Sequence, residues 1–328
     1  MVWLYFLFSA AVVVYAATKL AEFGDAIAVR ANLGGMFIGT LLMAGATSLP
    51  ELLSAINAIS IGAPDLAAGS MFGSGMFNMF MLGLLDLFYQ NARVLRRVAA
   101  THSLTASLAN LLTGLAVLFI LADINLSIGW VGLDSLLIIL FYIGGVRLLQ
   151  RRGGVSTGPA DIPETAGVPT LTKALLGFGA ATLALVLITP LMVGSANEIA
   201  VITGLSRGFI GATLIAIATS LPELVATLAA VRIGAYDLAI GNLFGSNVFN
   251  MFALGLTDIF YTQGRFLDII DPSFAIIGLL VISLTSLGLI GNLARVERRF
   301  FFLELDALLI LVGYFMGMYL LYIRGIGA

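Results

Sequence analysis

Cysteine is absent from this sequence, histidine occurs once, and charged residues are scarce. Without cysteine the chain has no disulfide, no thiolate metal site and no cysteine nucleophile. Only 10 % of the residues are charged, whereas soluble globular proteins carry about 25 %. The formal net charge is −2, so no strong field attracts nucleic acid or acidic partners. These shortages exclude a soluble enzyme, a nucleic-acid-binding protein and a disordered protein.

Long apolar runs make up most of the chain, since 60 % of the residues are hydrophobic. A membrane-spanning helix needs about 20 apolar residues. In lipid, every backbone polar group must be bonded within its own segment. We therefore predict an all-α polytopic membrane protein with ten transmembrane helices. They are expected at residues 2–30, 34–62, 66–90, 100–122, 126–149, 170–201, 206–233, 238–262, 273–293 and 301–323.

One connection, residues 150–169, has loop composition and divides the chain into two groups of five spans. We interpret residues 1–149 as a first five-helix repeat and 170–328 as a second one, joined by a cytoplasmic linker. With the N-terminus outside, twelve basic residues fall in cytoplasmic connections and three in external ones. This distribution follows the positive-inside rule. Both termini are then predicted to be external.

An internal repeat relates the two groups of spans. Residues 45–89 and 217–261 align without a gap at an offset of 172, and 28 of the 45 positions are identical. Chance apolar similarity would not keep proline, glutamate, asparagine and glycine in register. Because each group has an odd number of spans, the second must be inverted in the membrane. Inverted repeats around a site at the bilayer midplane are typical of secondary transporters.

Two carboxylates, Glu51 and Glu223, lie in mid-span at repeat-equivalent positions. A carboxylate at the bilayer centre is costly and is retained for a function. The pair indicates a shared cation site on the pseudo-twofold axis. Pro50 and Pro222 directly precede the glutamates, and proline removes a helical hydrogen bond. We therefore expect a broken helix in the second and seventh spans, and also in the glycine-rich third and eighth.

Other oxygen atoms are expected to complete the site. Hydroxyl and amide side chains accompany each glutamate. In the third and eighth spans, a serine and an asparagine are four residues apart and therefore share one helical face. Carbonyls are expected to be freed at the breaks. All-oxygen ligation selects Ca²⁺, Na⁺ or Mg²⁺, and two carboxylates suit Ca²⁺. The candidate metal ligands are Thr47, Ser48, Glu51, Ser74, Asn78, Thr219, Ser220, Glu223, Ser246 and Asn250, with the carbonyls of Ala44 and Ala216.

The paired Thr-Ser-Leu-Pro-Glu-Leu and Gly-Ser-(Asn)-x-Phe-Asn segments resemble the two alpha-repeats of the cation/calcium exchanger superfamily. Over essentially its whole length the chain is similar to prokaryotic sodium/calcium exchangers. The resemblance implies a Ca²⁺ site between Glu51 and Glu223, flanked by Na⁺ sites, in a prokaryotic inner membrane. It also implies alternating access by sliding of the first and sixth spans. Two residues depart from the family pattern: Asn250 replaces a common aspartate and Gly75 a usual asparagine.

We therefore expect a secondary antiporter that exchanges Na⁺ for Ca²⁺ and exports Ca²⁺. No cofactor, catalytic residue, nucleic acid or obligate protein partner is expected besides the transported ions. One alternative is a Ca²⁺ antiporter coupled to H⁺ or another monovalent cation, because both glutamates can titrate. Another is a passive cation channel. A membrane enzyme, such as an intramembrane protease, would have to rely on the carboxylate pair.

Overall fold

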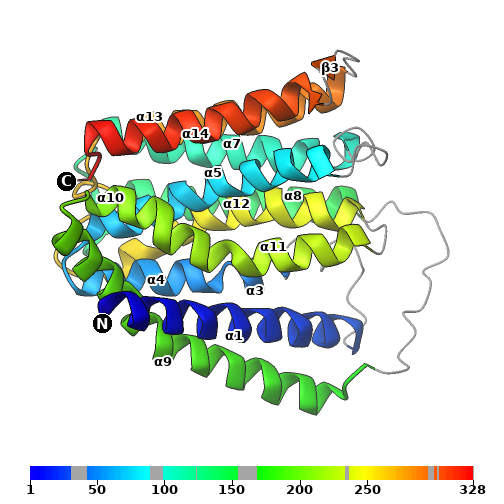
Figure 1. Ribbon diagram of the computed structural model, residues 1–328, viewed down its shortest axis with the longest axis horizontal. Coiled ribbons are helices and arrows are strands. Elements are labelled where there is room, and N and C mark those ends of the chain that lie inside the picture. The colour runs from blue at the N-terminus through cyan, green and yellow to red at the C-terminus, as the bar shows by residue number, and fades with distance from the viewer. Residues whose placement is uncertain are drawn as a thin grey trace.

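The structure is a computed structural model that describes residues 1–30, 43–88, 99–122, 124–153, 168–232, 236–294, 299–300 and 303–327. Its helices form one bundle, and both chain termini lie at the same end of it, called here the terminal end (Figure 1). The elements are α1 (Val2–Arg30), α3 (Met43–Thr47), α4 (Leu49–Ser60), α5 (Pro64–Phe88), α7 (Ala99–Ala122), β1 (Ser127–Ile128), β2 (Val131–Gly132), α8 (Leu133–Gly153), α9 (Leu171–Thr203), α10 (Arg207–Ile210), the π-helix η2 (Gly211–Ile215), α11 (Ala216–Arg232), α12 (Tyr236–Phe260), α13 (Phe274–Ala294), β3 (Arg299–Phe300), β4 (Leu303–Glu304) and α14 (Leu305–Arg324).

Helices occupy each of the ten ranges expected from the apolar runs, so the all-α fold is confirmed. Among the described residues, seven helical stretches are long and apolar enough to cross a membrane. These stretches lie in α1, α5, α7, α9, the α10–η2–α11 unit, α12 and α14. The helix α13 contributes a shorter apolar stretch, Phe274–Ile290. Residues 34–42 of the expected second span and 154–167 of the linker lie outside the described residues.

The two halves are arranged in opposite directions. The helices α1 and α9 are the first spans of their halves, and they lie side by side along one side of the bundle (Figure 1). In Figure 1, α1 runs away from the terminal end, whereas α9 runs toward it. The same reversal relates α5 to α12. An antiparallel relation between equivalent helices is what inverted repeats require.

Two short hairpins replace the expected starts of the fifth and tenth helices. Strand β1 pairs with β2 and β3 with β4, both antiparallel, and the second hairpin lies 172 residues after the first. The helices α8 and α14 therefore begin later than expected, at Leu133 and Leu305. In the first hairpin, Gly129 turns the chain with a φ of 68°. The Asp258 carboxylate accepts a hydrogen bond from Gly132 N at 2.7 Å and holds this hairpin against α12.

The expected helix breaks are only partly present. The second span is interrupted at Ser48, between α3 and α4, just before Pro50. In the seventh span, α11 continues through Pro222, and the irregularity is the π-helix η2 one turn earlier. Transmembrane helices tolerate proline when neighbouring groups satisfy the freed carbonyl. The helices α5 and α12 are continuous over 25 residues each, so the breaks expected in the third and eighth spans are wrong.

The glycines of α5 allow close packing instead of a break. A Cβ atom added to Gly69 would lie 2.4 Å from Gly208 O, and one added to Gly73 would lie 2.4 Å from the Ala212 Cα atom. Neither distance is sterically allowed. Small residues at such positions let two helix backbones approach in a membrane. The glycines therefore bring α5 against α10 and η2.

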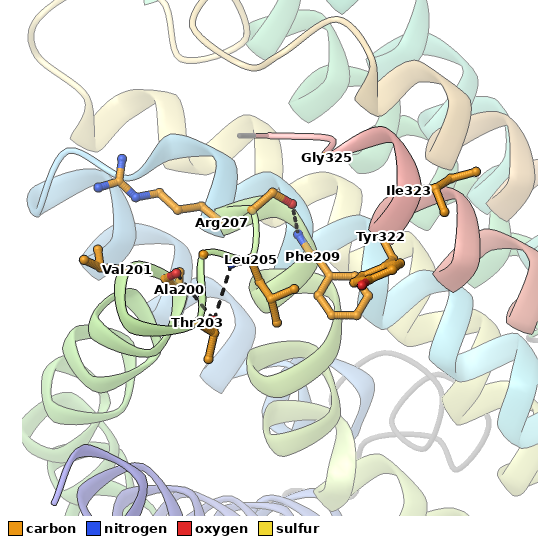
Figure 2. Close-up of a pocket in the computed structure, with 11 residues that line it drawn as sticks. Ala200, Val201, Thr203, Leu205, Arg207, Phe209, Tyr322, Ile323 and Gly325 are labelled. Atoms are coloured by element: carbon orange, nitrogen blue, oxygen red, sulfur yellow. Dashed lines mark hydrogen bonds between the residues drawn. The ribbon is translucent and has the colours of Figure 1, made fainter.

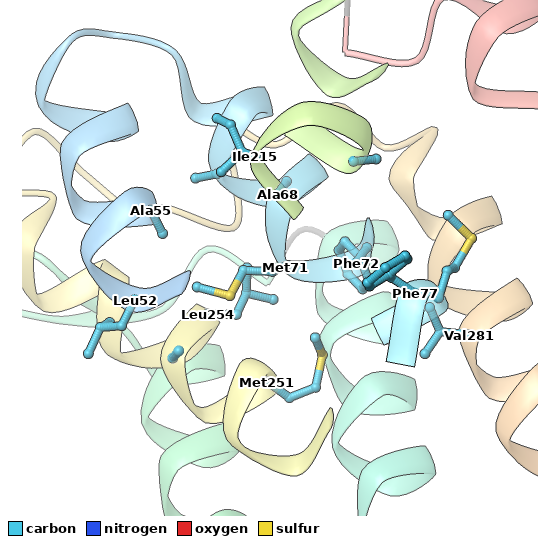
Figure 3. Close-up of a cluster of buried hydrophobic side chains, with 14 of the residues drawn as sticks. Leu52, Ala55, Ala68, Met71, Phe72, Phe77, Ile215, Met251, Leu254 and Val281 are labelled. Carbon is cyan, nitrogen blue, oxygen red and sulfur yellow. The ribbon is translucent and has the colours of Figure 1, made fainter. Parts of the chain in front are cut away.

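Apolar side chains fill the space between the central helices. Figure 3 shows Leu52, Met71, Phe72, Met251 and Val281 converging from α4, α5, α12 and α13, and all five are buried. By contrast, the outer helices α1, α9 and α14 expose many large apolar side chains. Such an extended apolar exterior suits contact with lipid. The polar residues of the central helices are therefore enclosed by apolar packing.

Candidate ion-binding site

The two glutamates lie in the interior of the bundle, and each is 0 % exposed. Glu51 is in the first turn of α4, and Glu223 is in α11 directly after Pro222. Proline is well suited to the first turn of a helix, and Pro50 occupies that position in α4. The unpaired backbone amides of a first turn favour a negative charge. The break at Ser48 thus places a carboxylate where the α4 helix dipole stabilises it.

Each glutamate is held by a serine from the other half of the chain. Ser48 Oγ donates a hydrogen bond to Glu223 Oε1 at 2.7 Å. Ser220 Oγ donates to Glu51 Oε1 at 2.9 Å. Ser48 and Ser220 are repeat-equivalent, so the two bonds are related by the pseudo-twofold arrangement. The crossed pairing brings the carboxylates of α4 and α11 into one site.

Serines of α5 and α12 approach the same carboxylate oxygens. Ser74 Oγ lies 3.4 Å from Glu51 Oε1, and Ser246 Oγ lies 3.4 Å from Glu223 Oε1. Ser220 Oγ also lies 3.0 Å from Ser74 Oγ. Both Oε1 atoms are therefore surrounded by hydroxyl groups. Four helices, α4, α5, α11 and α12, build the site.

Several side-chain polar atoms in this site, four oxygens and one nitrogen, have no hydrogen-bond partner although they are buried. They are Oε2 of both Glu51 and Glu223, Oδ1 of Asn78, and both side-chain polar atoms of Asn250. Leaving a buried polar atom unsatisfied costs about 1–3 kcal/mol, and more when the group is charged. A bound cation would satisfy the oxygens. Two carboxylates together with neutral oxygens fit the donor set of a hard cation such as Ca²⁺ or Na⁺.

The threonines and the carbonyls expected as ligands lie beside the site and contact each other. Thr47 Oγ1 donates to Ala44 O at 3.2 Å, and Thr219 Oγ1 lies 3.3 Å from Ala216 O. Thr219 Oγ1 also donates to Ile215 O at 3.0 Å. The Ala44 and Ala216 carbonyls thus accept hydrogen bonds instead of standing free at a break. A hydroxyl that donates to a carbonyl retains lone pairs for a cation.

Sequence reasoning missed the polar residues that position the site amides. Asn247 Oδ1 accepts a hydrogen bond from Asn78 Nδ2 at 2.8 Å, and Asn247 Nδ2 lies 3.4 Å from Gly75 O. Asn242 Nδ2 lies 3.4 Å from Glu223 O and donates to Thr227 Oγ1 at 3.2 Å. An asparagine inside an apolar span could have indicated these residues, because buried polar groups in a membrane need partners. Asn247 therefore fixes the orientation of the Asn78 amide and leaves the Oδ1 atom of Asn78 without a partner.

A separate cavity of about 750 Å³ lies at the terminal end and contains none of these residues (Figure 2). Arg207 extends from it and donates to Asn197 Oδ1 at 2.9 Å. A guanidinium group repels cations, so this cavity does not suit the same ligand. Its lining residues are Ala200, Val201, Thr203, Gly204, Leu205, Ser206, Arg207, Phe209, Tyr322, Ile323 and Gly325.

A buried all-oxygen site inside inverted membrane-spanning helices defines the class of the molecule as a membrane cation transporter. A family model for sodium/calcium exchanger protein matches residues 1–149 and 173–323. The chain therefore belongs to the sodium/calcium exchanger family. Membership makes it a transporter rather than an enzyme, with cation/Ca²⁺ antiport as its general activity.

Individual relatives agree with this assignment. The chain is 31 % identical over 277 residues to the inner membrane protein YrbG of Escherichia coli (strain K12). The aligned region covers 79 % of this chain and 78 % of YrbG. The chain is 51 % identical over 59 residues to the sodium/calcium exchanger MaX1 of Methanosarcina acetivorans, covering 18 % of this chain and 17 % of MaX1. The solved structure of the sodium-calcium exchanger NCX_Mj, soaked with Na⁺ and Sr²⁺, has a TM-score of 0.61 at 24 % identity, over 97 % of this chain and 99 % of that chain. At this identity the structural likeness shows the fold.

Proposed function

We propose that this protein exchanges Na⁺ for Ca²⁺ and exports Ca²⁺ under the inward Na⁺ gradient. The observation that carries the proposal is the pair of unpartnered, buried carboxylate oxygens on Glu51 and Glu223. Two carboxylates balance the charge of one Ca²⁺ or of two Na⁺. Competition of the two ions for one set of oxygens couples their movements in opposite directions.

In this proposal the twelve oxygen-bearing residues named from the sequence form overlapping ion sites. The glutamates bind Ca²⁺, and Asn78 and Asn250 add amide oxygens or position water. Hydroxyls of the serines and threonines complete the shells of Na⁺, which accepts neutral oxygen ligands. The serine O–H groups directed at both carboxylates hold one oxygen of each in place and leave the other oxygen for a cation.

Alternating access is proposed to involve sliding of α1 and α9 past the other helices. These two helices contact each other along one side of the bundle (Figure 1). They carry none of the proposed ligands, so they can move without dismantling the site. We further propose that both termini are external, in a prokaryotic inner membrane, because this orientation satisfies the positive-inside rule.

Ca²⁺ flux in proteoliposomes under separately imposed Na⁺, K⁺ and H⁺ gradients tests the proposal. We expect Ca²⁺ uptake to follow the Na⁺ gradient and to persist when the pH gradient is collapsed. Flux that requires the pH gradient and ignores Na⁺ would instead establish a H⁺-coupled antiporter. Discrete conductance steps in a planar bilayer would establish a channel.

A further inference from the structure

A second polar layer lies one helical turn from the glutamates, toward the terminal end. Ser54 on α4 and Ser70 on α5 are 1 % and 0 % exposed, and neither hydroxyl has a hydrogen-bond partner. Serine in a helix commonly donates to a preceding carbonyl, and neither of these two hydroxyls does so. Neither residue belongs to the site described above.

The register of α4 and α5 places these two serines at the same level along the two helices. The helices form an antiparallel pair joined by residues 61–63, and Glu51 faces Ser74 across their interface. One turn toward the connection leads from Glu51 to Ser54 on α4 and from Ser74 to Ser70 on α5, about 5–6 Å along the axes. The hydroxyls therefore occupy one level of the same interface.

The second half carries a bonded pair where the first half has none. Asn242 is the repeat equivalent of Ser70, and its amide donates to Thr227, the equivalent of Ala55, across the α11–α12 interface at 3.2 Å. With alanine at position 55, Ser70 lacks the hydroxyl partner that Asn242 has. The Asn242–Thr227 bond closes the polar layer on the side of the site away from the terminal end. At the corresponding level of the first half, the hydroxyls of Ser54 and Ser70 remain unpaired.

We propose that Ser54 and Ser70 form an additional Na⁺ subsite between Glu51 and the terminal end of the bundle. Their hydroxyls are neutral oxygens that suit a monovalent ion, whereas Ca²⁺ requires the carboxylates of the main site. A Na⁺ ion moving between this face and Glu51 exchanges water for these hydroxyls one turn before it reaches the carboxylate. The subsite rests on the proposed Na⁺ coupling and extends it to a defined step on the ion path.

The first test measures the Na⁺ concentration that gives half-maximal Ca²⁺ exchange in proteoliposomes, with Na⁺ added at the face of the terminal end. Ser54→Ala and Ser70→Ala should each raise it about fivefold, equivalent to ~1 kcal/mol for one lost oxygen contact. Half-saturation by Ca²⁺ should change less than about twofold, since its carboxylates remain. Ser70→Thr, which keeps the hydroxyl, should retain the wild-type Na⁺ half-saturation. Ser60→Ala, at the exposed end of α4, is the matched control and should behave as wild type.

The second test uses the absence of cysteine in the chain. In Ser70→Cys, a small methanethiosulfonate reagent should modify the thiol, and Na⁺ but not K⁺ should slow the modification. Thr227→Cys should show no such Na⁺ protection. Unchanged Na⁺ half-saturation in both alanine variants, or modification of Ser70→Cys that is indifferent to Na⁺, would overturn the subsite. Failure of wild-type Ca²⁺ flux to respond to Na⁺ would instead overturn the proposed coupling.

Discussion

The two halves of the molecule present matching carboxylates and serines to the site but unlike amides. In the first half, Asn78 Nδ2 donates to Asn247 Oδ1. This bond orients the amide, and Oδ1 of Asn78 keeps no partner. In the second half, the equivalent Asn250 has no partner for either polar atom. The reason is Gly75, which stands where Asn247 stands in the other repeat and has no side chain to offer. The carboxylates of the site are thus symmetric, whereas one amide is oriented by a hydrogen bond and the other is not.

Removing either glutamate tests the symmetric part of this comparison. Glu51→Gln and Glu223→Gln should each reduce Ca²⁺ transport more than about 100-fold, because a buried charge that loses its partner costs ~3–5 kcal/mol. Ca²⁺ uptake by reconstituted protein measures the effect, with thermal unfolding as the check that each variant is folded. Wild-type uptake in either variant would show that the halves do not share a site.

Truncating the two asparagines tests the asymmetric part. Asn78→Ala should raise the Ca²⁺ concentration for half-maximal transport about tenfold, because it removes a preorganised ligand and strands Asn247 Oδ1. Asn250→Ala should raise it only about threefold, since an amide that no hydrogen bond orients contributes less as a ligand. Concentration dependence of Ca²⁺ uptake gives both values. Equal effects would contradict the assigned difference between the amides.

Asn250→Asp adds a third carboxylate on the side of the site where the amide has no hydrogen-bond partner. Three neighbouring carboxylates do not all stay charged as readily as two, so one of them binds a proton at higher pH. Ca²⁺ transport should then decline at a higher pH on the acid side than in wild type. The pH profile of uptake between about pH 5 and 8 tests this expectation, with Asn78→Asp as the counterpart in the first half. A profile identical to wild type would place residue 250 outside the site.

Restoring the missing asparagine should make the halves more alike. A Cβ atom at Gly75 would lie 3.2 Å from a Val281 methyl group, so Gly75→Asn is combined with Val281→Ala. The new side chain should accept a hydrogen bond from Asn250 and improve Ca²⁺ half-saturation about twofold, a gain of ~0.4 kcal/mol from preorganisation. Val281→Ala alone is the control. Weaker Ca²⁺ binding in the double variant than in this control would argue against the role given to Gly75.

Much of the fold follows from the sequence because lipid imposes a simple length and polarity rule. The apolar runs located the helices, but local backbone departures depend on packing. A break was expected in the third span, whereas α5 is continuous and its Gly69 and Gly73 pack against α10 and η2. The first hairpin was missed although a glycine between Ile128 and Trp130 is a turn signal. The π-helix carries no comparable local signal.

The composition of the site was predictable from the repeat, and its pairing was not. Glu51 and Glu223 were identified because charge in mid-span is rare and occurs here at equivalent positions. The crossed bonds of Ser48 and Ser220 depend on the register between α4 and α11, which no local pattern encodes. The contrast between Asn247 and Gly75 was visible as a departure from the repeat. Its consequence for Asn250 required the three-dimensional contacts.

Equilibrium binding of radioactive Ca²⁺ to the purified protein tests most directly whether the two halves share one site. The shared site predicts one Ca²⁺ per chain, displaced by Na⁺, and loss of binding in both Glu51→Gln and Glu223→Gln. Two Ca²⁺ ions per chain, or unchanged affinity in either variant, would contradict it.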